Sequence, residues 1–246
     1  MPEITASSAD PAEIEKFAQL AAQWWDPGGA FAPLHKFNPI RLKFIRDVAA
    51  DHFGRDVRSR RLFEGLSLLD LGCGGGLLSE PMARLGFRVL GCDAAEENVR
   101  AAAAHAASTR ANVSYRCATP EVLAGEGAVF DVVLTMEIVE HVTDVGAFLG
   151  LCSRLVRPGG LIFVATINRT LKSLMLAKIA AEYVLRWLPP GTHDWNRFIE
   201  PARLGELAAE CGLKVRCIQG LAFDPFAWNW RLSADTAVNY VMVTER

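Results

Sequence analysis

The chain lacks the features that mark secreted, membrane-spanning or metal-ribbon proteins. Its 246 residues include six cysteines, none at Cys-x-x-Cys spacing, which disfavours a zinc site or a disulfide framework. The first residues carry no basic segment followed by an apolar one, so no signal peptide is expected. No apolar run reaches the roughly 18 residues that span a bilayer. We therefore expect a cytoplasmic protein.

Strong charge of either sign is also missing. Lys and Arg number 26 against 28 Asp and Glu, for a formal net charge of −2. Without a basic field, no nucleic-acid partner is expected. Apolar residues make up 51% of the chain and charged residues 22%, which is typical of a globular protein of this length.

Short apolar runs alternate with helical patterns from residue 66 onward. This alternation predicts an α/β fold with a doubly wound, mostly parallel, seven-stranded sheet of the Rossmann-like type. The predicted strands are 67–71, 87–92, 113–117, 130–136, 161–166, 213–218 and 237–243. Helices are expected at 76–85, 96–107, 144–155 and 201–211.

Residues 1–65 are predicted to form an N-terminal helical extension, and residues 66–246 the main domain. One helix is expected over 11–23, before the breaker cluster Asp26-Pro27-Gly28-Gly29. A second is expected over 40–53, with Pro39 in its first turn. A helical insertion at about 168–200 follows the fifth predicted strand.

The segment Asp70-Leu71-Gly72-Cys73-Gly74-Gly75-Gly76 joins a strand to a helix. Glycines there allow a sharp turn and let a ligand reach backbone N–H groups. Asp93 ends the second strand, where a carboxylate can accept hydrogen bonds from a ribose diol. A nicotinamide-binding fingerprint would require glycine at position 77, which is Leu77, so the loop favours a different nucleoside ligand. Met136, at the end of strand four, is expected beside that ligand.

Several further motifs extend this pattern over nearly the whole chain. They are Trp24-Trp25-Asp26, the segment 33–42 containing Asn38-Pro39-Ile40-Arg41, Met136-Glu137-Ile138-Val139-Glu140-His141-Val142, Asn168-Arg169 and Gly191-Thr192-His193-Asp194-Trp195. With the glycine loop, they resemble the ubiquinone biosynthesis O-methyltransferases, which are class I methyltransferases dependent on S-adenosylmethionine.

This resemblance implies four contacts with S-adenosylmethionine. Arg41 would pair with the methionine carboxylate, which a guanidinium can bind in two places. Gly72 would contact the methionine part through its backbone, Asp93 would hold the ribose, and Met136 would line the pocket.

The resemblance also implies methyl transfer to ring hydroxyls of polyprenylated phenols, namely 2-polyprenyl-6-hydroxyphenol and 3-demethylubiquinol. The alternative is another small phenolic or carbon acceptor. A phenol with a pKa near 10 needs a base or a metal ion to react at neutral pH.

Glu137, Glu140 and His141 are the candidates for that task. If the strand continues into a helix, their spacing places them on one face, where they could hold Mg²⁺. His141 as a metal-free base is a second hypothesis, and solvated acids at a helix start are a third. His193 is another candidate base.

The insertion carries an amphipathic pattern over 171–188. Lys172, Lys178, Glu182 and Arg186 share one side, opposite a wide apolar arc. This predicts either an interfacial helix on an anionic membrane or a helix that covers its own core. We expect peripheral contact with the inner face of the inner membrane, a polyprenylated phenol as substrate, and a ubiquinone-biosynthesis complex as partner. The aromatic stretch 221–230 could line the acceptor pocket or pack in the core.

Overall fold

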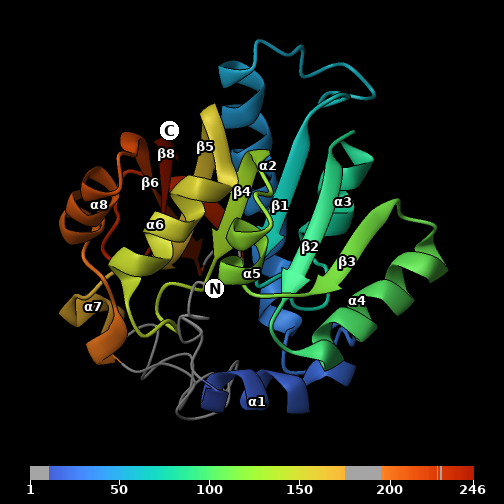
Figure 1. The fold of residues 1–246 in the computed structure, drawn as a ribbon. Coiled ribbons are helices and arrows are strands. Elements are labelled where there is room, and N and C mark those ends of the chain that lie inside the picture. The colour runs from blue at the N-terminus through green and yellow to red at the C-terminus, as the bar shows by residue number, and fades with distance from the viewer. Residues whose placement is uncertain (1–10, 175–194, 226, 228) are drawn as a thin grey trace.

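A sheet of eight strands forms the centre of the computed structural model, which describes residues 11–174, 195–225, 227 and 229–246 (Figure 1). The strand order is β3-β2-β1-β4-β5-β8-β6-β7. The parallel strands are β1 (Ser67–Leu71), β2 (Arg88–Asp93), β3 (Val113–Cys117), β4 (Phe130–Met136) and β5 (Val156–Ile167). β8 (Asn239–Glu245) pairs antiparallel with β5 and with β6 (Lys214–Asp224), and β7 (Asn229–Ser233) pairs antiparallel with β6.

The predicted doubly wound, mostly parallel sheet is confirmed, with one strand more than expected. β7 lies where a loop was predicted, and it continues the sheet as an edge strand beside β6. Its five residues, Asn229-Trp230-Arg231-Leu232-Ser233, alternate polar and apolar side chains, which is a strand pattern that the prediction overlooked. The short helix α5 (Pro120–Gly125) was also not predicted.

Helices cover both faces of the sheet. α2 (Ala32–His52) and α3 (Ser79–Arg84) pack on one face, in a cluster with side chains of β1, β4 and β5. α5, α6 (Val145–Leu155) and α8 (Pro201–Glu210) pack on the other (Figure 1). α4 (Glu96–Thr109) lies against β2 and β3. Because both faces are covered, every residue of β1 is buried, including the polar Asp70.

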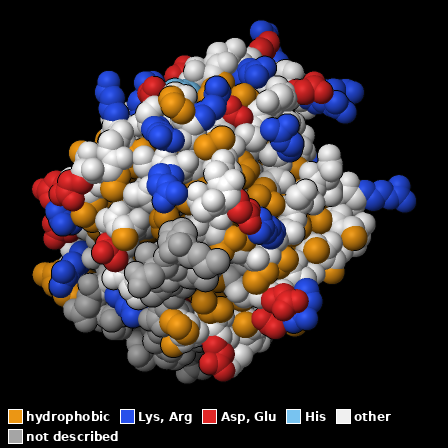
Figure 2. All heavy atoms as spheres, in the orientation of Figure 1, with side chains coloured by type: hydrophobic (Ala, Val, Ile, Leu, Met, Phe, Trp, Pro, Cys, Tyr) orange, Lys and Arg blue, Asp and Glu red, His pale blue; other side chains and the backbone are white. Residues whose placement is uncertain are grey.

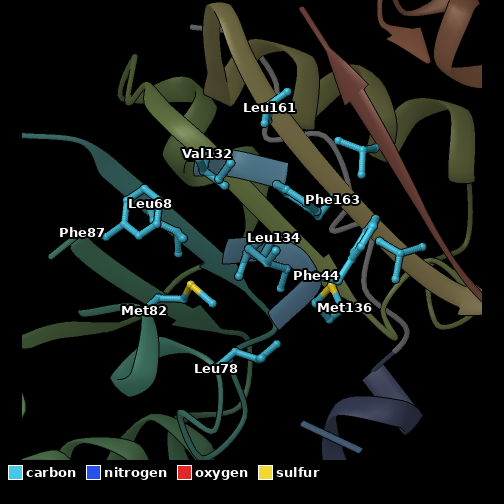
Figure 3. Close-up of a cluster of buried hydrophobic side chains, with 14 of the residues drawn as sticks. Phe44, Leu68, Leu78, Met82, Phe87, Val132, Leu134, Met136, Leu161 and Phe163 are labelled. Carbon is cyan, nitrogen blue, oxygen red and sulfur yellow. The ribbon is translucent and has the colours of Figure 1, made fainter. Parts of the chain in front are cut away.

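The N-terminal segment differs from the prediction in where its second helix begins. α1 covers Pro11–Gln19 and a 3₁₀ turn covers Ala21–Gln23, but α2 starts at Ala32, so that Pro39 is inside it. A proline there removes one backbone hydrogen bond. The apolar face of α2 offsets that loss, because Phe37, Phe44 and Ile45 are buried in the core. Figure 3 shows Phe44 among side chains of β4 and β5, including Met136 and Phe163.

α2 therefore shares its core with the sheet, although it falls in the predicted extension 1–65. The division into residues 1–65 and 66–246 stays a prediction.

The predicted insertion at 168–200 lies mostly outside the described residues. Its first turn, α7 (Leu171–Ser173), is capped by the Thr170 hydroxyl, which accepts a hydrogen bond from the backbone N–H of Ser173. The amphipathic helix predicted for 171–188 cannot be followed further, because residues 175–194 are not described. Within the described ranges, no helix combines the length and the apolar character needed to cross a membrane.

Acidic, basic and apolar side chains are interspersed on the face shown in Figure 2.

Candidate active site

The glycine bend after β1 has the backbone geometry that its sequence predicted. Gly72, Gly74 and Gly76 have φ angles of 65°, 51° and 84°, a region that other residues rarely adopt. Space at Gly72 is equally restricted, because a Cβ built there would lie 2.1 Å from Cδ1 of Ile138. The bend can therefore bring backbone N–H groups against a ligand only while these positions stay glycine.

Asp70 lies beneath the bend with 2% of its surface exposed. Its Oδ2 accepts a hydrogen bond from the Ser79 hydroxyl at 2.6 Å. Burial raises the pKa of Asp70 to about 6, while the Ser79 hydrogen bond and the positive charge of Arg41 oppose that rise. Asp70 thus ties β1 to α3 and adds negative charge under the bend.

Asp93, at the end of β2, is joined directly to the glycine bend. Its Oδ2 accepts the backbone N–H of Gly74 at 2.9 Å, and its Oδ1 accepts the backbone N–H of Ala95 at 2.9 Å. Burial raises the pKa of Asp93, and these hydrogen bonds oppose the rise. Because a carboxylate offers about four lone-pair sites, the side chain retains acceptor capacity for a hydroxyl group.

Gly72, Asp93 and Met136 form one row across three adjacent strands. Leu71 of β1 pairs with Cys92 of β2 and with Thr135 of β4. Each of the three residues comes directly after that paired row. This places them side by side at the carboxyl edge of the sheet, at the point where the strand order reverses, which is where open α/β sheets bind ligands.

Arg41 reaches this edge from α2 and is almost completely buried. Its Nη2 donates to Oδ1 of Asn38 at 2.7 Å, and Nδ2 of Asn38 donates to the carbonyl of Leu77 at 3.0 Å. Nη1 lies 3.7 Å from Oε1 of Glu137. Burial lowers the pKa of Arg41, and the carboxylates of Glu137 and Asp70 partly restore it. Asn38 was not predicted, although its i, i+3 spacing from Arg41 was a usable signal.

The Arg41 guanidinium has a donor left over. Its Nε is buried and has no hydrogen-bond partner among the described residues. A buried N–H without a partner is costly, and a ligand carboxylate would satisfy it. With the glycine bend, this orphaned donor fits the methionine end of S-adenosylmethionine.

The chain after β4 does not form the helix on which the shared face of Glu137, Glu140 and His141 depended. Glu137 forms a bend, residues 139–141 form a turn, and Val142 is an isolated bridge residue. Glu137 has a φ of 60°, unusual for a residue with a Cβ. Positive φ at a polar residue beside a ligand site is a form of strain that concentrates at functional positions.

Two of the three candidate side chains, Glu137 and Glu140, lie within hydrogen-bonding reach of each other, whereas His141 contacts a different partner. Oε2 of Glu140 accepts the Thr166 hydroxyl at 2.8 Å, whereas Glu137 lies near Arg41. Nδ1 of His141 lies 3.0 Å from Oε2 of Glu13 in α1. Burial raises the pKa of Glu140 well above its ordinary value, and the Glu137 carboxylate adds to the rise.

A three-ligand metal site is not assembled in this arrangement. Among the described residues, no group of three or more His, Cys, Asp or Glu side chains is placed to hold a metal ion. The Mg²⁺ site at Glu137, Glu140 and His141 stays a prediction, and it would require His141 to turn from Glu13 toward the two carboxyl groups. His193 lies outside the described residues.

Part of the aromatic stretch 221–230 packs against α2. The ring of Trp230 lies 4.2 Å from Phe37 and 5.5 Å from Phe223, centroid to centroid. Phe226 and Trp228 are not described.

The fold and the site together define a class of protein, and comparisons with known proteins agree. A family model described as "Methyltransferase domain" matches residues 43–218. Solved structures with the same fold include a magnesium protoporphyrin IX methyltransferase from Synechocystis PCC 6803 with bound SAH, at a TM-score of 0.61 and 18% identity over 96% of this chain and 94% of that one. A protein from Pyrococcus horikoshii matches at a TM-score of 0.63 and 15% identity over 94% and 98%. The chain is an α/β methyltransferase.

Curated relatives narrow the class. The ubiquinone biosynthesis O-methyltransferase of Caulobacter vibrioides is 56% identical over 97% of this chain and 95% of its own length. That of Sinorhizobium medicae is 53% identical over 100% and 99%. The chain belongs to the family of ubiquinone biosynthesis O-methyltransferases.

Proposed function

We propose that this chain transfers a methyl group from S-adenosylmethionine to ring hydroxyls of polyprenylated phenols in ubiquinone biosynthesis. The acceptors are 2-polyprenyl-6-hydroxyphenol and 3-demethylubiquinol. The observation that carries the proposal is the row formed by Gly72, Asp93 and Met136 at the switch point of the sheet, with the unsatisfied Arg41 donor at its side.

Each of these residues has a separate task in holding the donor. Arg41 pairs with the methionine carboxylate, Gly72 contacts the methionine part through its backbone, and Asp93 accepts hydrogen bonds from the ribose. Met136 lines the pocket from β4. When bound, S-adenosylmethionine supplies an electrophilic methyl carbon on a sulfonium. The protein's contribution is chiefly to place an acceptor oxygen in line with that carbon.

The residues after β4 handle the proton of the acceptor hydroxyl. As the oxygen–carbon bond forms and the carbon–sulfur bond breaks, the hydroxyl proton must leave. We assign its uptake to His141, since Glu140 is buried and its Oε2 is occupied by the Thr166 hydroxyl. Glu137, held near Arg41, faces the same region as a carboxylate.

Metal dependence of turnover distinguishes His141 as a metal-free base from a Mg²⁺ site at Glu137, Glu140 and His141. Turnover that survives EDTA treatment leaves His141 as the base. Turnover that EDTA abolishes and Mg²⁺ restores assigns Glu137, Glu140 and His141 as ligands instead.

The substrate class is tested by mass spectrometry with trideuteromethyl S-adenosylmethionine. A catechol with an isoprenoid tail should gain one labelled methyl on oxygen, and the same catechol without a tail should react more slowly. Equal rates for both catechols, or labelling on carbon, would instead support another small phenolic or carbon acceptor.

We also propose peripheral contact with an anionic membrane through the segment that starts at α7. In support, Leu171 is 74% exposed at the start of this segment, and the substrate carries an apolar tail. Liposome flotation should show binding that weakens when Lys172, Lys178 and Arg186 are changed to alanine. Neutralising Arg58, Arg60 and Arg61, which precede β1 at the other end of the sheet, is the matched control. Equal loss of vesicle binding in both variants, or no flotation at low salt, would contradict membrane contact through this segment.

A cytoplasmic location and a ubiquinone-biosynthesis complex stay predictions without assigned residues.

A further inference from the structure

The amide of Asn98, in the first turn of α4, links two parts of the molecule that are far apart in sequence. Its Nδ2 donates to Oδ1 of Asp93 at 3.2 Å. Its Oδ1 accepts the indole N–H of Trp24 at 2.8 Å, across 74 residues of sequence. Asn98 is 2% exposed and Trp24 is 8% exposed, so water does not compete strongly for either group.

The hydrogen-bonding chemistry of the two partners fixes the orientation of the Asn98 amide. An indole N–H can only donate, so the Asn98 side chain must turn its oxygen toward Trp24. Its NH₂ group then faces Asp93. Without the indole N–H, the buried Asn98 oxygen would lose its partner, and the bond to Asp93 alone would hold the amide in place.

Trp24 is itself held firmly in place. Its ring stacks on Phe31 at 3.6 Å between centroids and 3° between planes. The same ring lies against the glycine bend, where a Cβ added to Gly74 would come within 2.3 Å of it. Next to it, the indole N–H of Trp25 donates to the carbonyl of Gly75 at 2.8 Å.

We propose that Trp24, acting through Asn98, is a positioning residue for the ribose-binding carboxylate of Asp93. The N-terminal segment is then part of the cofactor site, although it lies outside the β-strands and loops that hold the nucleoside. This inference rests on the proposed function, because it needs Asp93 to hold the ribose of S-adenosylmethionine.

Calorimetry with S-adenosylhomocysteine tests the proposal. Trp24→Phe keeps the ring and its stack on Phe31 but removes the N–H. Loss of a neutral buried hydrogen bond should raise Kd about three- to tenfold. Trp195→Phe is the matched control, since it removes an indole N–H that donates to the carbonyl of Thr170 at 3.1 Å, and its Kd should stay at the wild-type value.

A double-mutant cycle then separates positioning from general loosening. If Trp24 acts through Asn98, then Trp24→Phe combined with Asn98→Ala should bind no more weakly than Asn98→Ala alone. Independent, additive losses would overturn the proposal. 5′-Methylthioadenosine, which keeps the ribose but lacks the carboxylate, should lose the same factor as S-adenosylhomocysteine. A loss seen only with S-adenosylhomocysteine would place the defect at the methionine end and contradict the proposal.

Two outcomes distinguish a failure of the proposed function from a failure of the proposed role of Trp24. A wild-type chain that fails to bind S-adenosylhomocysteine removes the proposed function. A wild-type chain that binds it, with Trp24→Phe unchanged, removes only the role of Trp24. Thermal unfolding identifies a misfolded variant, in which case Asn98→Ala, which leaves the aromatic stack intact, carries the test.

Discussion

Substituting Gly72 with alanine should destabilise the protein through two separable effects. The φ of 65° disfavours a residue with a Cβ by about 1–2 kcal/mol. The new methyl group would also lie 2.1 Å from Cδ1 and 2.9 Å from Cγ1 of Ile138. Overpacking of this kind costs about 1–3 kcal/mol, because the side chain must move to another rotamer. The expected loss in the free energy of unfolding is therefore roughly 2–5 kcal/mol, measured by urea denaturation.

Two companion variants divide that loss. Gly212 has a φ of 74° and nothing within 4 Å of a Cβ built on it, so Gly212→Ala should show only the backbone cost. Combining Gly72→Ala with Ile138→Val removes the Cδ1 atom and should recover part of the loss. If Gly72→Ala proved no more harmful than Gly212→Ala, the close approach of Ile138 to the bend would be refuted.

Three further predictions concern charge and chemistry. The raised pKa of Asp70 means that its contribution to stability is fully present below pH ~4 and is lost as the pH rises through about 6, a change of roughly 3 kcal/mol. In urea titrations across this range Asp70→Asn should lack that part of the decline, and an unchanged slope would contradict the assigned burial. Arg41→Lys should weaken S-adenosylhomocysteine binding roughly 10- to 100-fold, because an ammonium cannot replace the forked guanidinium; wild-type affinity by calorimetry would rule out the carboxylate contact. His141→Ala should lower kcat about 100-fold or more while leaving cofactor affinity within about twofold; unchanged turnover would exclude both a base and a ligand role.

The core of the fold could be predicted from the sequence because its strands are buried on both faces. β1 and β4 are short, mostly apolar runs followed by glycine or polar residues, so pattern alone located them. β7 was missed although Asn229–Ser233 alternates polar and apolar side chains, because the run is only five residues long and was included in an aromatic loop. The start of α2 was misplaced because a local sequence signal was overridden by tertiary packing. Pro39 indicated a helix start at that position. Phe37 packs against Trp230 and the core, however, and the helix already begins before Pro39, at Ala32.

The residues that hold the cofactor could be placed from local sequence patterns, whereas the residues expected near the methyl acceptor could not. Glycine spacing and an acid at the next strand end place Gly72 and Asp93, since parallel strands bring their carboxyl ends together. The positions of Glu137, Glu140 and His141 depended on whether a helix follows β4. The positive φ of Glu137 turns the chain instead, and no sequence rule for glutamate anticipates that. The contact between Trp24 and Asn98 was equally hidden, because nothing in the sequence relates residues 74 positions apart.

Binding of the donor nucleoside tests the central claim most directly. Calorimetry on the purified wild-type chain should show saturable, one-to-one binding of S-adenosylhomocysteine, weakened by Asp93→Ala, and no comparable affinity for NAD. A chain that binds neither compound, or that prefers NAD, would contradict the account of the glycine bend, Asp93 and Arg41 given above.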